Sequence, residues 1–211
     1  MMKNPVSVTA LEELGRVRLS PSFYLRDFLY SEIAAVHRLC NIPTTPELAI
    51  RFGGLLCNEL LEPIQERFGR ITIRSAYRSC EVNSFGNARG FGCASNESNY
   101  ARHIWDRPDQ HGRHGAMACI VLPWFADRYA AGEDWRAMAW WIHDHLPYSS
   151  LCFFPKLAAF NIGWHELPER RIDSYVAPRG CLTRPGMAGH EGGHQRHYAA
   201  MVAAREAACQ T

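Results

Sequence analysis

The chain has 211 residues, 47% of them hydrophobic, which is enough for one sizeable core and predicts a single domain. Its 23 basic and 21 acidic residues are spread along the chain and give a net charge of +2, so the charge pattern indicates neither a nucleic-acid partner nor an anionic membrane. No stretch approaches the roughly 18 apolar residues that cross a bilayer, and the first residues do not resemble a secretory signal. We therefore expect no membrane partner and a chain that is cytoplasmic as synthesised.

Two helices and a strand are predicted in the first half of the chain. Residues 22–40 favour a loop and a short helix, and Pro43 ends it, because proline disfavours helix in the residue before it. A long helix with a broad apolar face is predicted over 45–68, with a possible kink at Pro63. The alternating, β-branched residues 71–75 predict a strand.

The rest of the chain predicts short strands around one buried helix. Residues 84–115 are rich in Gly, Asn, Ser and Arg and show little periodicity, so we expect a long irregular segment, a kind that is usually functional when ordered. The other expected elements are strands at 117–121, 151–154 and 160–165 and helices at 133–145 and 194–209. This order predicts an α+β fold with a small, mostly antiparallel sheet packed on the long helix.

Histidines and cysteines are the candidates for chemistry. The chain has no HExxH, GxSxG or P-loop motif, and its eight cysteines form no CxxC pair, so most should be reduced and buried. A zinc site needs three protein ligands, often from different strands, and a loop histidine together with Cys119 and His165 could supply them. Judged singly, Cys119 is more typical of a core residue, and histidines of a glycine-rich loop are more typical of the surface.

Three histidines near the end of the chain form a separate group. His190, His194 and His197 are spaced i, i+4 and i+7, which places them on one face of a helix. Such a face could capture a metal ion, but the preferred interpretation is a solvent-exposed helix surface.

The first part of the chain carries motifs of a known family. The opening FYLRDFLYSE, the LEP that ends the long helix and the segment SAYRSCEVN (75–83), with alanine in place of the family's glycine, resemble the N-terminal half of peptidase family M15, subfamily A. These proteins are zinc D-Ala-D-Ala carboxypeptidases and peptidoglycan endopeptidases of the Hedgehog/DD-peptidase fold. The resemblance implies that fold, and it implies that Arg78 binds the terminal carboxylate of the substrate, with Ser75 and Tyr77 beside it.

The resemblance also implies a zinc site, with two departures. The stretch GAMACI aligns with the family's G-x-A-x-D-I and puts Cys119 where the family has a zinc-binding aspartate. His165 fits the last ligand, and the first is His103 or, with one extra residue, His111. The family's general base corresponds to Ile162, so no catalytic base is assigned. Both departures point away from efficient hydrolysis.

Two functions follow from the resemblance. The first is a zinc peptidase-like protein that acts on peptidoglycan stem peptides, and the second is a non-catalytic cell-wall-binding or virion structural module that keeps the fold. In both cases we expect the family domain at 21–178, between an N-terminal segment (1–20) and a C-terminal loop and helix (179–211). Delivery to the cell wall would require a holin, a virion or another export route.

Overall fold

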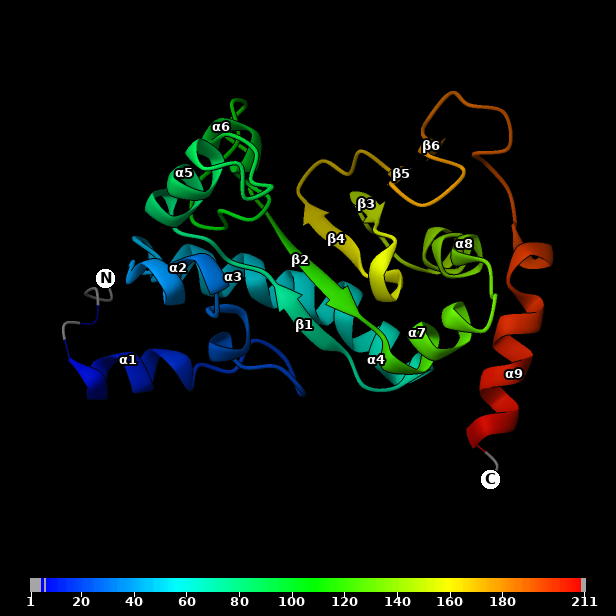
Figure 1. The fold of residues 1–211 in the computed structure, drawn as a ribbon, viewed down its shortest axis with the longest axis horizontal. Coiled ribbons are helices and arrows are strands. Elements are labelled where there is room, and N and C mark those ends of the chain that lie inside the picture. Colours follow the sequence, from blue (N-terminus) through cyan, green and yellow to red (C-terminus); the bar gives the residue numbers. More distant parts are fainter. Residues whose placement is uncertain (1–4, 6, 210–211) are drawn as a thin grey trace.

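The computed structural model describes residue 5 and residues 7–209. It consists of a six-stranded sheet with helices packed against it (Figure 1). The helices are α1 (Val8–Gly15), α2 (Glu32–His37), α3 (Pro46–Leu56), α4 (Glu62–Phe68), α5 (Cys80–Ala88), α6 (Asn96–Asn99), α7 (Pro123–Ala130), α8 (Trp135–His145) and α9 (Ala199–Cys209). The strands are β1 (Thr72–Ser75), β2 (Gly115–Val121), β3 (Ser150–Phe153), β4 (Phe160–His165), β5 (Arg171–Ser174) and β6 (Gly180–Thr183).

The strand order is β1-β2-β4-β3-β5-β6. Strands β3 and β5 run parallel, and the other neighbouring pairs run antiparallel. The α+β class and the mostly antiparallel sheet are therefore confirmed. Strands β5 and β6 were not predicted.

The predicted long helix is present, but it is not regular. A π-helical turn, Cys57–Leu61, joins α3 to α4, and Pro63 lies at the start of α4. Proline has no N–H to donate, and its ring crowds the carbonyl four residues earlier, so a wider turn just before it accommodates the ring. Along its inner face the helix buries Ala49, Phe52, Leu56, Leu60, Ile64 and Phe68.

The sheet has one face toward this helix and one toward a cleft. Because side chains alternate along a strand, Ala118 of β2 and Ile162 of β4, which are paired and fully buried, belong to the helix-packed face. Cys119 and Asn161, the next pair in register, belong to the opposite face. Figure 1 shows α3 and α4 running along β1 and β2, with α5 and α6 grouped at the far end of β2.

Two expectations for irregular and helical segments are only partly confirmed. Within 84–115 the chain forms the end of α5 and the short α6, because Ser79 and Ser95 each accept a hydrogen bond from a backbone N–H and so begin a helix. The terminal helix begins at Ala199 rather than 194, and the preceding segment folds back over α8. Among the described residues no helix combines the length and apolar character that crossing a membrane requires.

A cleft on the open face of the sheet

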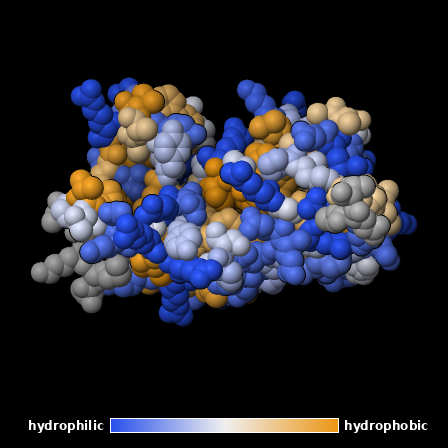
Figure 2. Space-filling view, turned by 90° about the horizontal axis from the view of Figure 1, so that it is seen from below, coloured by the Kyte–Doolittle hydropathy of each residue, from blue (hydrophilic) through white to orange (hydrophobic). Residues whose placement is uncertain are grey.

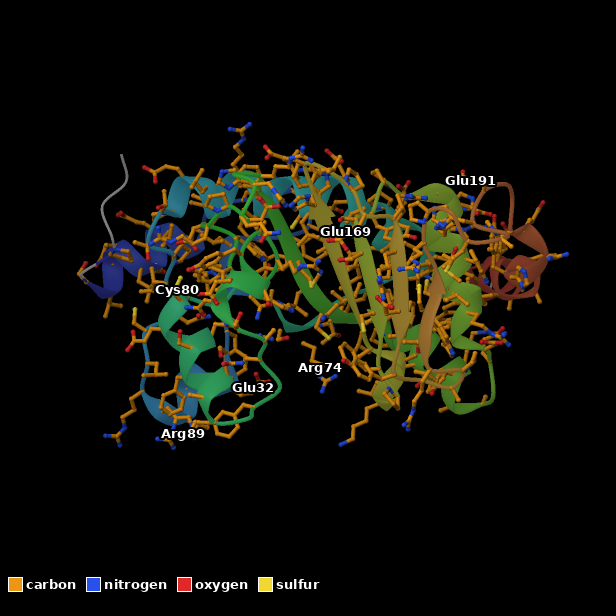
Figure 3. All side chains as sticks on the ribbon, turned by 90° about the horizontal axis from the view of Figure 1, so that it is seen from above. Glu32, Arg74, Cys80, Arg89, Glu169 and Glu191 are labelled. Carbon is orange, nitrogen blue, oxygen red and sulfur yellow. The ribbon has the colours of Figure 1, made fainter. Side chains whose placement is uncertain are left out.

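Two adjoining cavities of about 900 and 530 Å³ lie on the open face of the sheet. They share six lining residues, His103, Cys152, Asn161 and Tyr175 among them, so they form one continuous cleft. We call the larger cavity the histidine end and the smaller one the arginine end. Figure 3 shows the gap between α2 and α5 on one side and the sheet on the other, with Arg74 in it.

The arginine end holds two guanidinium groups from β1 and the turn that follows it. Arg78 Nη1 lies 3.4 Å from Asn83 Oδ1 and 3.4 Å from Cys93 Sγ, both neutral partners. Within the described part of the chain, neither Arg74 nor Arg78 has a carboxylate at ion-pair distance. Glu32 also lines this end, but it is not at ion-pair distance from either guanidinium, so the two positive charges have no direct acidic partner among the described residues.

The turn that carries Arg78 is fixed by buried polar groups. Asn41 donates from its side-chain nitrogen to the carbonyls of Leu29 and Tyr77, and its oxygen accepts from the Ser79 N–H at 2.7 Å. Arg78 in turn donates its backbone N–H to the carbonyl of His103 at 2.8 Å. The turn and the loop that carries His103 are thus held together.

Ser75 and Tyr77, the other residues predicted beside the substrate, also line the arginine end. Ser75 pairs with Cys119 across β1 and β2. Tyr77 is 1% exposed and donates its hydroxyl to Asp106 Oδ1 at 3.2 Å. Burial, followed by the charge of Asp106, raises the pKa of Tyr77, so this phenol stays protonated and its hydrogen is already used within the protein.

His103 stands where the two ends of the cleft meet. Its Nδ1 lies 2.8 Å from the carbonyl oxygen of Ala76. A carbonyl only accepts hydrogen bonds, so Nδ1 carries the proton and Nε2 keeps its lone pair. Burial, helped by the charge of Arg78, lowers the pKa of His103 to about 3, so the imidazole is neutral near pH 7.

Close packing holds the chain beyond His103 in place. Trp105 is fully buried and donates its Nε1 hydrogen to the Met117 carbonyl at 3.1 Å. It packs on α3 at Gly53, where a Cβ atom would lie only 2.6 Å from the indole ring. A larger residue at 53 would displace Trp105 and, with it, the His103 loop.

His165 and Asp109 form a pair at the histidine end. His165 Nε2 lies 3.3 Å from Asp109 Oδ2. Burial opposes ionisation of Asp109, but backbone N–H groups of Arg113 and His111 donate to the carboxylate and hold its pKa below the usual value. His111, the alternative first ligand, is exposed, and its ring lies 3.2 Å from the Gln110 side chain.

The three predicted zinc ligands do not converge on one ion in this arrangement. Cys119 is paired with Asn161, whereas His165 is paired with Gly115, four residues away along each strand and therefore roughly 13 Å distant. Zinc ligands lie about 2.0–2.3 Å from the metal, which requires their donor atoms to be near one another. Among the described residues no group of three or more His, Cys, Asp or Glu is placed to hold a metal ion, and zinc binding stays a prediction.

Neither Cys119 nor Ile162 brings a base to the cleft. Burial raises the pKa of Cys119, against the opposing charges of Arg74 and Arg78, so the group is a neutral thiol. Ile162 faces the core helix and has no ionisable group. Glu166, which follows His165, already accepts a hydrogen bond from the His114 N–H at 2.8 Å.

Several cleft residues were not predicted. Arg74 could have been predicted from the sequence, because alternation along 71–75 places it on the face opposite to the partly buried Ile73. Asn161, Cys152 and Asp173 lie in one row across β4, β3 and β5, which only the strand order brings together.

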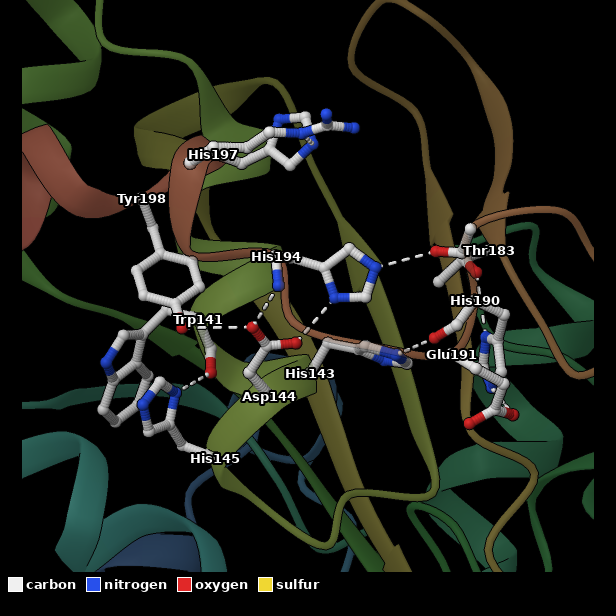
Figure 4. A network of polar contacts seen from close by, with 12 residues as sticks. Trp141, His143, Asp144, His145, Thr183, His190, Glu191, His194, His197 and Tyr198 are labelled. Carbon is white, nitrogen blue, oxygen red and sulfur yellow. Dashed lines mark hydrogen bonds and ion pairs between the residues drawn. The ribbon is translucent and has the colours of Figure 1, made fainter.

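Figure 4 shows a second group of buried histidines, which we call the C-terminal histidine cluster: His143, His190 and His194. None of the three lines the cleft. His194 Nδ1 lies 2.6 Å from Asp144 Oδ1, and its Nε2 lies 2.7 Å from the Gly189 carbonyl. The expectation of exposed histidines on a helix face is therefore wrong for His190 and His194, which are 5% and 7% exposed and precede α9.

No protein-family model, no curated protein and no solved structure matches this chain. The chemistry of the cleft therefore rests on its own geometry: two guanidinium groups without a carboxylate partner at one end, a neutral histidine with a lone pair in the middle, and an aspartate–histidine pair at the other end. Such a cleft suits an extended, polar ligand that carries a carboxylate.

Proposed function

We propose that the protein binds peptidoglycan stem peptides in this cleft and that it has the Hedgehog/DD-peptidase type of fold. In this proposal the terminal carboxylate of the peptide pairs with Arg78, and the rest of the peptide runs past His103 into the histidine end. The observation that carries the proposal is Arg78 itself, a partly buried guanidinium with only neutral partners among the described residues.

The charge and size of the cleft support such a ligand. A guanidinium that is partly withdrawn from water gains most from an anion that accepts two parallel hydrogen bonds, and a carboxylate has that geometry. The two cavities of about 900 and 530 Å³ give room for several residues of an extended peptide. Binding alone requires no general base, which is consistent with isoleucine at position 162.

The binding proposal is tested with a synthetic stem peptide that ends in D-Ala-D-Ala. Calorimetry should show binding of the free acid and at least tenfold weaker binding of the C-terminal amide, and Arg78→Gln should cause a similar loss. Arg16→Gln is the matched control, because the side chain of Arg16 is 68% exposed and does not line the cleft. Equal affinities for the acid and the amide would refute the proposal.

The second candidate function is the zinc peptidase implied by the resemblance. It is favoured by His103, because a histidine that donates from Nδ1 to a backbone carbonyl presents Nε2 in the way metal ligands do. The cleft as described does not bring Cys119 and His165 to the same ion, so we derive no reaction step from them.

Metal analysis separates the two candidates. If the protein is a zinc peptidase, purified protein contains stoichiometric zinc and releases D-alanine from the stem peptide. The zinc is lost in each of three variants, His103→Asn, Cys119→Ala and His165→Ala. Protein that takes up no zinc from a zinc-containing buffer but still binds the peptide excludes the peptidase and leaves the binding function.

A further inference from the structure

Exposed aromatic rings stand on both walls of the arginine end. Tyr30 is 63% exposed, Phe91 is 48% exposed and Tyr175 is 61% exposed, and all three line this cavity. A single exposed aromatic side chain is ordinary, but three around one cavity are a feature of ligand sites. Figure 2 shows the notch between the two parts of the molecule, with hydrophobic side chains on both of its sides.

Two of these rings are held in place by a second ring behind them. Tyr175 stacks on Phe154, with ring centroids 5.6 Å apart and planes 11° apart. Phe91 stacks on His37 on the opposite wall, with centroids 5.7 Å apart and planes 18° apart. A ring that is supported on one face and open to solvent on the other offers a flat, rigid surface at little entropic cost.

Arg74 supplies a charge beside these rings. It is exposed, it has no carboxylate at ion-pair distance among the described residues, and Figure 3 shows it in the gap between α2 and the sheet. Its positive charge acts on the neutral thiol of Cys119, whose pKa it lowers against the larger effect of burial. The proposed function uses Arg78 and leaves Arg74 without a role.

We propose that Arg74, Tyr175 and Phe91 form a subsite for an acidic sugar, the muramic-acid part of peptidoglycan. The C–H face of the sugar ring stacks on Tyr175 and faces Phe91, the Tyr175 hydroxyl is available to the sugar hydroxyls, and the carboxylate pairs with Arg74. This inference deepens the proposed function and rests on it, because it assigns a second part of the same cell-wall polymer to the same cleft. A peptide terminus on Arg78 and a sugar acid on Arg74 give each guanidinium one anion.

Two sugars that differ by one group test the subsite. N-acetylmuramic acid is N-acetylglucosamine with a lactyl ether that carries a carboxylate, so the pair isolates the contribution of the charge. We expect measurable binding of the acid by calorimetry or saturation-transfer NMR and about tenfold weaker binding of the neutral sugar. Arg74→Gln should bring the acid down to the affinity of the neutral sugar.

Variants of the rings complete the test. Tyr175→Ala should weaken both sugars about tenfold, the contribution of one stacked ring, while Tyr175→Phe keeps most of the affinity. Tyr24→Ala is the control, because Tyr24 is 41% exposed but does not line the cleft. Sugar affinities that do not change in Tyr175→Ala and Arg74→Gln would overturn the subsite.

The outcomes for the two proposals remain distinguishable. Stem peptide that binds through Arg78 while neither sugar binds overturns the subsite and leaves the proposed function. If wild-type protein binds neither the stem peptide nor the sugars, the subsite and the proposed function are both overturned. The sugar measurements use wild-type protein and single surface variants, so a folding defect would be visible in the circular dichroism of each variant.

Discussion

The cleft and the C-terminal histidine cluster both bury histidines, but the two regions use the imidazole differently. In the cleft, one ring nitrogen of His103 is hydrogen-bonded to the Ala76 carbonyl, and the other forms no hydrogen bond with the described residues. In the cluster, His194 has both nitrogens at 2.6–2.7 Å from groups that only accept hydrogen bonds, the Asp144 carboxylate and the Gly189 carbonyl. Both nitrogens of His194 must therefore carry hydrogens, and its ring is an imidazolium.

This difference distinguishes a histidine with an unbonded ring nitrogen from one whose two ring nitrogens are both bonded within the protein. The His194 cation lies against the carboxylate of Asp144 and stacks on Trp140, with ring centroids 4.0 Å apart. It fastens the segment before α9 onto α8 and has no free atom for a ligand. His103 keeps a lone pair directed into a cavity, so the histidine that has fewer bonds is the one that can act on a ligand.

The largest expected effect comes from removing the counter-charge in the cluster. Asp144 accepts hydrogen bonds from the His194 N–H, the His194 ring and the Tyr198 hydroxyl, and the two paired side chains are about nine-tenths buried. Asp144→Ala leaves the His194 cation buried without a partner and should lower the free energy of unfolding by about 3–5 kcal/mol. Urea denaturation at pH 7 measures the change.

An exposed ion pair provides the control for Asp144. Arg16 and Glu12 pair on α1 with side chains 68% and 49% exposed, so Glu12→Ala should change the free energy of unfolding by less than about 0.5 kcal/mol. Burial alone would raise the pKa of Asp144, but the bonds from His194 and Tyr198 hold it below its usual value. The contribution of Asp144 should thus be present above about pH 4 and fade below it. Equal losses in both variants would contradict the structural role of the cluster.

The second largest effect is the loss of stability that His103 should cause at acid pH. The pKa of His103 is lowered to about 3 in the folded protein, so below the ordinary value near 6.5 the unfolded chain takes up a proton that the folded chain does not. Stability is then lost as pH falls from about 6.5 toward 3, and His103 should account for about 2 kcal/mol between pH 7 and pH 5. Urea denaturation across this range gives the slope.

His103→Asn removes the titration and keeps the hydrogen bond. The amide nitrogen of asparagine takes the place of Nδ1 and can still donate to the Ala76 carbonyl. The variant should lose less stability between pH 7 and pH 5 than the wild type, although His143, whose pKa burial also lowers, still contributes. Identical slopes for the two proteins would show that His103 is not neutral and buried in solution.

The sequence predicts the elements of this fold better than it predicts how they meet. The strand at 160–165 matches β4 residue for residue, and alternation alone puts Ile162 on the buried face. The strand order, with β4 between β2 and β3, comes from pairings between distant parts of the chain. For this reason the cleft row of Cys119, Asn161 and Cys152 could not be predicted, although each residue lies in a predicted strand.

The spacing of the last three histidines led to a wrong prediction because a helix was assumed there. His190, His194 and His197 would share a face only on a helix, and the chain there is held instead by tertiary hydrogen bonds, such as that from the His194 N–H to Asp144. The spacing of the motif around Arg78 was more informative, because Ser79 caps α5 and the turn before it places the guanidinium in the cleft. Whether that residue binds a carboxylate remains a prediction.

A smaller loss of stability is expected at His143 of the C-terminal histidine cluster. Tyr148 donates its hydroxyl to His143 Nδ1 at 2.7 Å, because His143 Nε2 already donates to the His190 carbonyl. Tyr148→Phe leaves a buried nitrogen without a donor and should cost about 1–2 kcal/mol of unfolding free energy. Tyr129→Phe is the control, since the hydroxyl of this partly buried tyrosine forms no hydrogen bond with the described residues. Equal stabilities of the two variants would mean that water replaces the lost donor.

The smallest effect on stability is expected at the rim of the cleft. Arg102 and Glu169 line the histidine end and form an ion pair at 2.5 Å, with side chains 38% and 47% exposed. Because water screens such a pair, Glu169→Gln should change the free energy of unfolding by less than about 0.5 kcal/mol. The pair nevertheless links the loop of His103 to the segment before β5, so amide hydrogen exchange should quicken in residues 99–103 and stay unchanged at His194. Unchanged exchange in both places would mean that the walls of the cleft are held by packing around Trp105 rather than by this pair, and the cleft would then be as rigid as the cluster.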